Sequence, residues 1–333
     1  MQIWHRHLGR CLYIYAVGFL FVSPVLDWID NEAMKNKGIG AYLLITFLGA
    51  WGLWLIGWVA ASRVFRVSPT NLLFQFVLLP GAFMPAMAAI IVRKWITHEG
   101  FSDAGLQLNF RKNWKYFIFA GYILPIVVLG SIMGLAALFG ISHPDFSLHR
   151  SLAILVPQVK PSSVQFTPGL WVIWMLQLML TGIPLAALVT WGEEFGWRSY
   201  LQIRLFAERP VLAAVVTGLI WGLWHYPLIF LGYEHYENIG VGLVVFPVCT
   251  ILLSIIFGWL RMKTGSIWSS SIAHGATNNL GASLALLFFL GGPKFTFVSY
   301  LGILSWIPLG ALCAWILLTR QLTTTTPASV GSL

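Results

Sequence analysis

The chain has 333 residues, of which 58% are hydrophobic and only 9% are charged, whereas an ordinary soluble domain has roughly 25% charged residues. The 20 basic and 11 acidic side chains cannot cover the surface of a water-soluble globule of this size, so lipid must be the solvent for most of that surface. The composition therefore excludes a soluble protein and predicts an all-α polytopic membrane protein. The net charge of +9 is scattered along the chain rather than gathered in one domain, so we expect no nucleic-acid partner.

Apolar stretches long enough to cross a membrane, about 20 residues each, recur along the whole chain and predict a bundle of about eight to nine transmembrane helices. In chain order these stretches are Cys11–Leu26, Gly40–Ser62, Ser68–Val92, Tyr116–Gly140, Gly169–Thr190, Pro210–Gly232, Asn238–Leu260, Ile267–Gly291 and Val298–Thr319. The first is interpreted as an uncleaved anchor, because bulky residues stand where a signal peptide needs small ones. Pro80 and Pro85 predict a kink or a break in the third.

Basic residues predict the orientation of the bundle, because cytoplasmic loops are enriched in Lys and Arg. With the amino terminus outside, most of the 20 basic residues fall inside. We expect residues 1–115 to hold N-terminal spans and a basic cytosolic loop, residues 116–320 to form the core bundle, and residues 321–333 to be a disordered tail. The long polar link 141–168 is expected to be an irregular outer loop.

Ionisable side chains at membrane depth are costly, so each one found there is a candidate functional residue. Apart from the adjacent Glu193 and Glu194, we place the acidic residues in loops or tails. Of the eight histidines, we place only His225 and His274 inside apolar stretches. Two glutamates and two histidines are therefore the candidates for chemistry. The three cysteines, in contrast, are interpreted as packing residues: Cys11, Cys249 and Cys313.

The two glutamates follow an apolar stretch without a strong helix breaker behind them, so we expect the helix to continue through them. On a helix, Glu194 and Arg198 are four residues apart and share a face, which predicts an ion pair. Glu193 then points about 100° away and is free to exchange a proton in a cavity. The alternative is that both carboxylates lie in a hydrated interfacial loop.

Polar side chains also recur at helical spacing around the two histidines. His225 follows Trp221 by four residues, and Asn278 follows His274 by four, with Ser270 one turn earlier. Such groups on apolar helices can serve as hydrogen-bonding contacts between helices. The alternative is that His274 and Asn278 place two donors beside a developing negative charge.

Two chemistries fit these candidates. A carboxylate that takes a proton from water turns it into a nucleophile, and donors in an apolar pocket stabilise the oxyanion formed at a carbonyl. Alternatively, Glu193 with His225 and His274 would make a two-histidine, one-carboxylate set that suits Zn²⁺. The His-Glu-x-x-His motif of many zinc proteases does not occur in the chain.

These residues carry a resemblance to the CAAX protease and bacteriocin-processing family of intramembrane peptidases, also called the Abi family. The first motif of that family, Glu-Glu-x-x-x-Arg, matches Glu193, Glu194 and Arg198. The similarity covers roughly residues 116–319.

The second and third motifs follow in the family's order. Phe-x-x-x-His is met by Trp221 and His225, with Trp in place of Phe, and His-x-x-x-Asn is met by His274 and Asn278. The resemblance implies an all-helical bundle with a cavity open to the cytosol. In it Glu193 activates water, His225 assists or binds a metal, and His274 with Asn278 forms an oxyanion hole. Supporting roles then fall to Glu194, Arg198 and Trp221.

The sequence thus predicts an intramembrane endopeptidase in a bacterial plasma membrane, with its active site facing the cytosol. Its expected partners are membrane lipid and a membrane-associated peptide or protein, including a prenylated, CAAX-like tail. No cofactor is required by this interpretation, and Zn²⁺ is the alternative. Two other functions stay open: a proton-coupled transporter in which the same Glu and His residues relay protons, and an immunity or scaffold protein that binds a peptide without cutting it.

Overall fold

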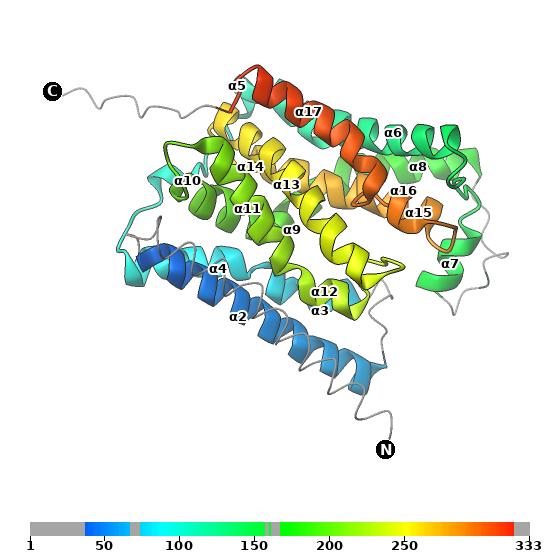
Figure 1. The fold of residues 1–333 in the computed structure, drawn as a ribbon, viewed down its shortest axis with the longest axis horizontal. Coiled ribbons are helices and arrows are strands. Elements are labelled where there is room, and N and C mark those ends of the chain that lie inside the picture. The colour runs from blue at the N-terminus through cyan, green and yellow to red at the C-terminus, as the bar shows by residue number, and fades with distance from the viewer. Residues whose placement is uncertain (1–36, 67–73, 157–159, 161–166, 323–333) are drawn as a thin grey trace.

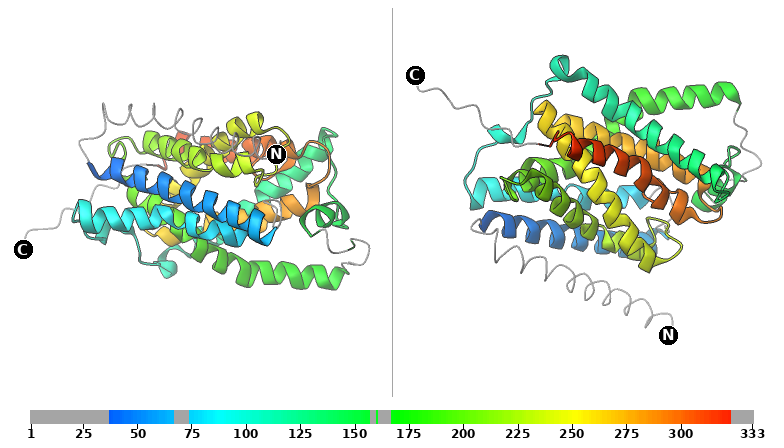
Figure 2. Two further views of the ribbon diagram at one scale, coloured as in Figure 1. Left: turned by 90° about the horizontal axis from the view of Figure 1, so that it is seen from below. Right: turned by 45° about the horizontal axis from the view of Figure 1, so that its top comes forward.

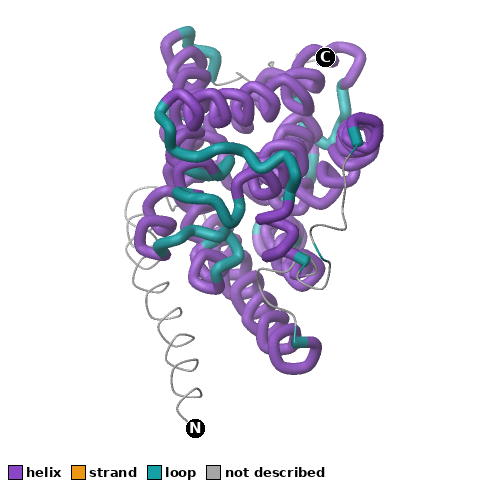
Figure 3. The backbone as a smooth tube through the Cα atoms, turned by 90° about the vertical axis from the view of Figure 1, so that its right-hand side faces the viewer, coloured by secondary structure: helices purple, strands orange, loops and turns teal. Residues whose placement is uncertain are grey.

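The computed structural model describes residues 37–66, 74–156, 160 and 167–322. Every regular element among them is helical (Figure 3). The α-helices are α2 (Lys37–Ala60), α3 (Phe74–Ala82), α4 (Met84–Ile91), α5 (Phe110–Ile118), α6 (Leu124–Leu138), α7 (His149–Leu155), α8 (Pro168–Gln177), α9 (Ile183–Gly196), α10 (Gln202–Arg204), α11 (Pro210–Trp224), α12 (Tyr226–Leu231), α13 (Ile239–Thr264), α14 (Ile267–Ala276), α15 (Ser283–Phe289), α16 (Phe295–Val298) and α17 (Trp306–Leu318).

Short helical turns of other kinds join several of these helices. Six are wider π-helical turns: η1 (Ala61–Phe65), η2 (Val92–Ile96), η4 (Phe119–Ile123), η6 (Leu178–Gly182), η7 (Trp197–Leu201) and η8 (Thr277–Ala282). Two are 3₁₀ turns: η3 (Ser102–Ala104) and η9 (Ile303–Ser305). Turns η7 and η8 directly follow the helices that carry the two glutamates and His274, and π turns occur frequently at functional sites.

The helices confirm the expected polytopic bundle. Seven helical stretches in the described part are long and apolar enough to cross a membrane: Gly38–Val64, Phe74–Ile96, Phe110–Leu138, Pro168–Arg204, Pro210–Leu231, Ile239–Thr264 and Phe295–Leu318. The expected span Ile267–Gly291 also forms helix, as α14, η8 and α15 in succession. The expected first span and nearly all of the predicted tail lie outside the described residues.

Local details differ from the sequence expectations in two places. The link 141–168 is not wholly irregular, because α7 forms within it and its N-terminal turn is fixed by Asp145, whose carboxylate accepts from the backbone N–H groups of Ser147 and Arg150. The expected break near Pro80 and Pro85 occurs at Phe83, between α3 and α4, but the two helices continue as one span.

Helices α11, α13 and α14 lie towards the middle of the bundle, and α8 lies at its edge (Figures 1 and 2). In the span Pro210–Leu231, 72% of the apolar 18-residue stretch is buried inside the protein. The corresponding share is 17% in the span Pro168–Arg204. The N-terminal helices pack on the rest, since α4 contacts α9. The division into residues 1–115 and 116–320 stays a prediction.

Helices α9 and α14 approach each other closely at one small residue. An added methyl group at Gly275 of α14 would lie 2.6 Å from the backbone nitrogen of Ala187 and 2.8 Å from the carbonyl carbon of Ala186, both on α9. These are backbone atoms, so they cannot move away from an added methyl group as the end of a flexible side chain could. Gly275 therefore permits the close contact between the helix that carries the glutamates and the helix that carries His274.

Gly275→Ala is expected to destabilise the protein by about 1–3 kcal/mol, the usual cost of overpacking, because α14 must move away from α9. Thermal unfolding of the purified protein in detergent measures this. Gly130→Ala on α6 is the matched control, since an added methyl group there meets no atom within 4 Å. Equal melting temperatures for the two variants would contradict the packing argument.

Candidate active site

Glu194 is the most deeply buried acid of the site. It lies on α9 with 0% exposure, and its Oε1 accepts hydrogen bonds from Arg198 Nη1 and His274 Nδ1, each at 2.9 Å. The pair with Arg198 confirms the contact expected from their four-residue spacing. A buried carboxylate is tolerated only when it is paired, and here one oxygen joins α9 to α14.

Glu193 points elsewhere, as its position one residue earlier on the helix requires. Its Oε2 accepts a hydrogen bond of 2.8 Å from the indole nitrogen Nε1 of Trp221 on α11. Glu193 is 7% exposed and lies in the wall of a cavity. The two adjacent carboxylates therefore have different environments: one is held between charged partners and the other faces open space.

Trp221 connects most of the site. The guanidinium carbon of Arg198 lies 4.4 Å from the centre of its ring system, within the range of a cation–π interaction. Its ring centroid lies 5.1 Å from that of His274 and 5.9 Å from that of His225. The sequence predicts only a supporting role for Trp221, in place of Phe. Its indole N–H group, which Phe lacks, could have indicated a polar role, because a buried N–H needs a hydrogen-bond acceptor.

His225 sits at the junction of α11 and α12, where the expected continuous helix is interrupted. Its Nδ1 lies 3.0 Å from the carbonyl oxygen of Trp221. A carbonyl only accepts, so Nδ1 carries a proton and donates it. In a neutral ring Nε2 is then left as an acceptor.

His274 and Asn278 lie on successive segments, α14 and η8, and both contribute to the cavity wall. His274 is 3% exposed, whereas Asn278 is exposed. Ser270, one turn before His274, donates to the carbonyl oxygen of Phe257 on α13 at 2.8 Å. Ser270 is therefore a contact between helices, and the other two residues are the polar groups near open space.

The cavity has a volume of about 520 Å³, which is within the range of small-molecule and peptide side-chain sites. It brings together side chains from α3, α9, α11, α13, α14, η8 and the segment before α13. The expected catalytic residues all line it: Glu193, His225, His274 and Asn278. Much of the remaining wall is apolar, including Leu78, Val189 and Phe246.

The alternative zinc site is not assembled by these side chains. Among the described residues, no three His, Cys, Asp or Glu side chains are grouped so that they could hold a metal ion. Nδ1 of His225 and of His274 is hydrogen-bonded, to the carbonyl oxygen of Trp221 and to Glu194 respectively, which leaves Nε2 of each ring open. Glu193, His225 and His274 do not fit a three-ligand site in this arrangement.

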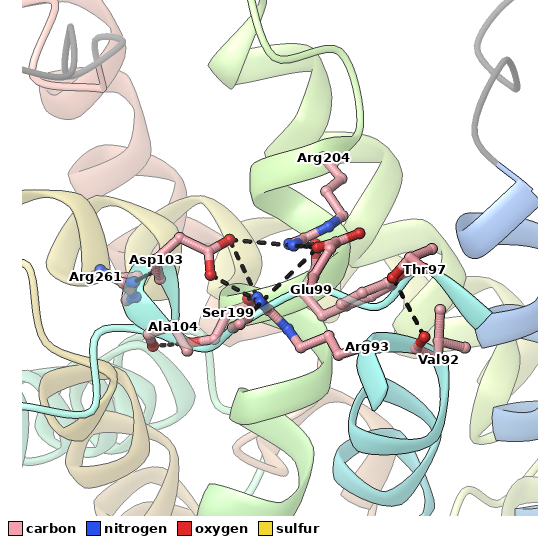
Figure 4. Close-up of polar contacts among 11 residues, drawn as sticks. Val92, Arg93, Thr97, Glu99, Asp103, Ala104, Ser199, Arg204 and Arg261 are labelled. Atoms are coloured by element: carbon pink, nitrogen blue, oxygen red, sulfur yellow. Dashed lines mark hydrogen bonds and ion pairs between the residues drawn. The ribbon is translucent and has the colours of Figure 1, made fainter. Parts of the chain in front are cut away.

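An ionic cluster fixes the end of the segment that carries the glutamates (Figure 4). Arg93, on η2 and 1% exposed, donates to both carboxylate oxygens of Asp103 at 2.8 and 3.1 Å and to the carbonyl oxygen of Ser199 on η7 at 3.0 Å. Arg204 binds Glu99 and Asp103. Since η7 follows α9 directly, this cluster holds the end of the helix on which Glu193 and Glu194 lie.

The fold and the site define a polytopic membrane protein with a buried carboxylate–histidine centre on the wall of a cavity. Residues 167–280 match the model of a family described as type II CAAX prenyl endopeptidase Rce1-like, and this range contains all three sequence motifs. The chain is also 28% identical over 231 residues to "CAAX prenyl protease 2" of Methanococcus maripaludis, which covers 67% of this chain and 75% of that protein. Over the part that carries the three motifs, the chain is therefore similar to CAAX prenyl endopeptidases.

Trp221→Phe is expected to lower the peptidase rate about 10-fold without abolishing it, because Phe fills the space but cannot donate the hydrogen bond that orients Glu193. A hydrogen bond to a charged group contributes about 1.5–3 kcal/mol. Steady-state kinetics on one peptide substrate measures the change. Trp114→Phe, at an exposed position on α5, is the control. A Trp221→Phe variant with the native rate would show that the bond to Glu193 is dispensable.

Asp103→Asn is expected to lower the melting temperature at neutral pH by a few degrees. Burial alone would raise the pKa of Asp103, but the hydrogen bond and charge of Arg93, with the charge of Arg204, outweigh it and hold the pKa below the ordinary 3.8. A lowered pKa contributes stability that is present above pH 3.8 and is lost as the pH falls through the lowered value. The difference between native protein and variant should therefore disappear in acid. A melting series from pH 7 to pH 2 tests this, with Glu208→Gln as control.

Proposed function

We propose that this protein hydrolyses a peptide bond of a membrane-associated peptide or protein, with Glu193 as the base that activates water. The observation that carries the proposal is the separation of the two glutamates. Glu194 is occupied by Arg198 and His274, whereas Glu193 lies on the cavity wall with one oxygen held by Trp221. A carboxylate that is oriented by one hydrogen bond and also faces a cavity is suited to general base catalysis.

In the proposed reaction, Glu193 takes a proton from water and the oxygen of that water attacks the carbonyl carbon of the scissile bond. The carbonyl oxygen becomes an oxyanion. When the C–N bond breaks, the protonated Glu193 gives its proton to the leaving amine. The products are a carboxylic acid and an amine, and no covalent enzyme intermediate forms.

His274 and Asn278 are proposed to stabilise the oxyanion, since both line the same cavity as Glu193. His274 uses Nδ1–H for Glu194, so its ring must also carry a proton on Nε2 to donate to an oxyanion. The Glu194 carboxylate supplies the counter-charge for that doubly protonated ring. Asn278 has a side-chain NH₂ group and needs no such change.

His225 is proposed to orient the attacking water. Its Nδ1–H is fixed by the carbonyl of Trp221, so Nε2 can accept a hydrogen bond from a water molecule in the cavity. A second acceptor beside Glu193 would align the water so that one lone pair faces the substrate.

The substrate is proposed to be a lipid-associated tail, including a prenylated CAAX-like sequence, as the name of the relative from Methanococcus maripaludis indicates for that protein. We also propose that the site faces the cytosol, because Arg93, Arg204 and Arg261 gather at the η7 end of the bundle (Figure 4) and basic residues mark the cytoplasmic side. A bacterial plasma membrane as its location stays a prediction.

Glu193→Gln should abolish peptide cleavage, because an amide cannot take a proton from water. Asn278→Ala should retain activity lowered by roughly 100- to 1000-fold, the usual effect of removing one oxyanion donor. Cleavage of a lipid-anchored peptide library by purified protein, followed by mass spectrometry, measures both. Glu208→Gln, at an exposed position between α10 and α11, should match the native protein.

Two results would contradict this assignment. One is measurable cleavage by Glu193→Gln at more than a trace of the native rate. The other is complete loss in Asn278→Ala while the melting temperature is unchanged, since a single donor contributes only part of the stabilisation of the transition state.

A further inference from the structure

A second carboxylate lies in the wall of the active-site cavity. Glu234 belongs to the segment between α12 and α13, which the sequence assigned to an ordinary loop, and it lines the same cavity as Glu193. The mechanism proposed above does not use it. An acidic side chain in a largely apolar cavity is costly unless a partner offsets its charge, so its presence there requires an explanation.

The segment that carries Glu234 is firmly attached on its C-terminal side. The carboxylate of Glu237 accepts from the backbone N–H of Phe295 at 2.5 Å and of Thr296 at 2.9 Å, at the start of α16. The hydroxyl of Tyr236 donates to the carbonyl of Leu301 at 2.5 Å. Glu234 is therefore held at a fixed place relative to the bundle.

The backbone turns sharply on both sides of Glu234. Gly232 has φ of 82° and His235 has φ of 57°, and the second value is unusual for a residue with a side chain. Such conformations persist where the surrounding structure determines them, and they are common at functional sites. This turn brings Glu234 to the cavity instead of directing the segment straight into α13.

The charge of Glu234 has no counterpart in the described part of the chain. No hydrogen bond or ion pair to its carboxylate is formed there, and none of the described residues that line the cavity is Lys or Arg. Burial, with the nearby charge of Glu193, raises the pKa of Glu234 to about 8. A cation placed beside Glu234 would favour the ionised carboxylate, and the two opposite charges would attract each other.

We propose that Glu234 binds a basic side chain, Lys or Arg, of the peptide substrate next to the bond that the water activated by Glu193 attacks. This inference rests on the proposed function and names a preference of the same site. A basic side chain supplies the missing positive charge, whereas an acidic one would face both Glu193 and Glu234. A free amino terminus carries the same charge, but an internal bond is flanked by side chains.

A peptide series tests this preference directly. Farnesylated peptides of one backbone sequence carry either Lys or the neutral, similarly sized Gln at successive positions around the scissile bond. The protein is held in neutral phosphatidylcholine nanodiscs, so that anionic lipid does not concentrate the basic peptides. At one position Lys should raise kcat/KM about 10-fold over Gln, chiefly through a lower KM. Acetylated and free amino termini should behave alike.

Variants assign the preference to one carboxylate. Glu234→Gln should raise the KM of the Lys peptide to that of the Gln peptide, and Glu234→Lys should reverse the preference toward a Glu peptide. Glu208→Gln should keep the native preference. Retention of the Lys preference by Glu234→Gln, or no Lys preference at any position in the native protein, would overturn the proposal.

A binding measurement separates this inference from the proposed function. In the Glu193→Gln background, fluorescence anisotropy should show the Lys peptide bound about 10-fold more tightly than the Gln peptide, and adding Glu234→Gln should make the two equal. Preferential binding without cleavage by the native protein would defeat the proposed function alone. Cleavage with equal binding of both peptides would defeat this inference alone.

Discussion

The buried charge of Glu194 is the constraint on which the rest of the site depends. A carboxylate with 0% exposure among apolar helices must be paired, and its Oε1 accepts from both Arg198 and His274. Arg198 in turn lies over the ring of Trp221. The Oε1 atom of Glu194 therefore joins α9 to α14, and Arg198 extends this connection to α11. Separating the helices would remove the bond from His274 to Glu194 and the contact of Arg198 with Trp221.

The position of Glu194 on the helix also explains why Glu193 faces the cavity instead of an ion-pair partner. Consecutive helical residues point about 100° apart, so Glu193 cannot share the partners of Glu194 and instead meets the indole of Trp221 and the cavity. Two identical side chains thus have different environments for a purely geometric reason. The ionic cluster around Arg93 and the close approach at Gly275 maintain this geometry from the end and from the side of α9.

The distribution of charge separates two regions of the protein. Arginines gather with Glu99 and Asp103 beside η7 (Figure 4), where the charges of both signs offset one another. The described cavity wall has glutamates and histidines but no Lys or Arg. A ligand of the cavity therefore meets a site that can attract positive charge, and this property belongs to the arrangement rather than to the composition, which is basic overall.

The sequence by itself determined the membrane spans, the family motifs and the contacts between residues four apart, such as Glu194 with Arg198 and Trp221 with His225. These follow from apolar length and helical periodicity, which are local properties. Only the tertiary structure decided that Glu194 meets His274, 80 residues away, that Trp221 donates to Glu193, 28 residues away, and that Glu234 of a connecting segment reaches the cavity. Periodicity fixes which side chains share a face of one helix, whereas the partner of that face depends on how the helices pack.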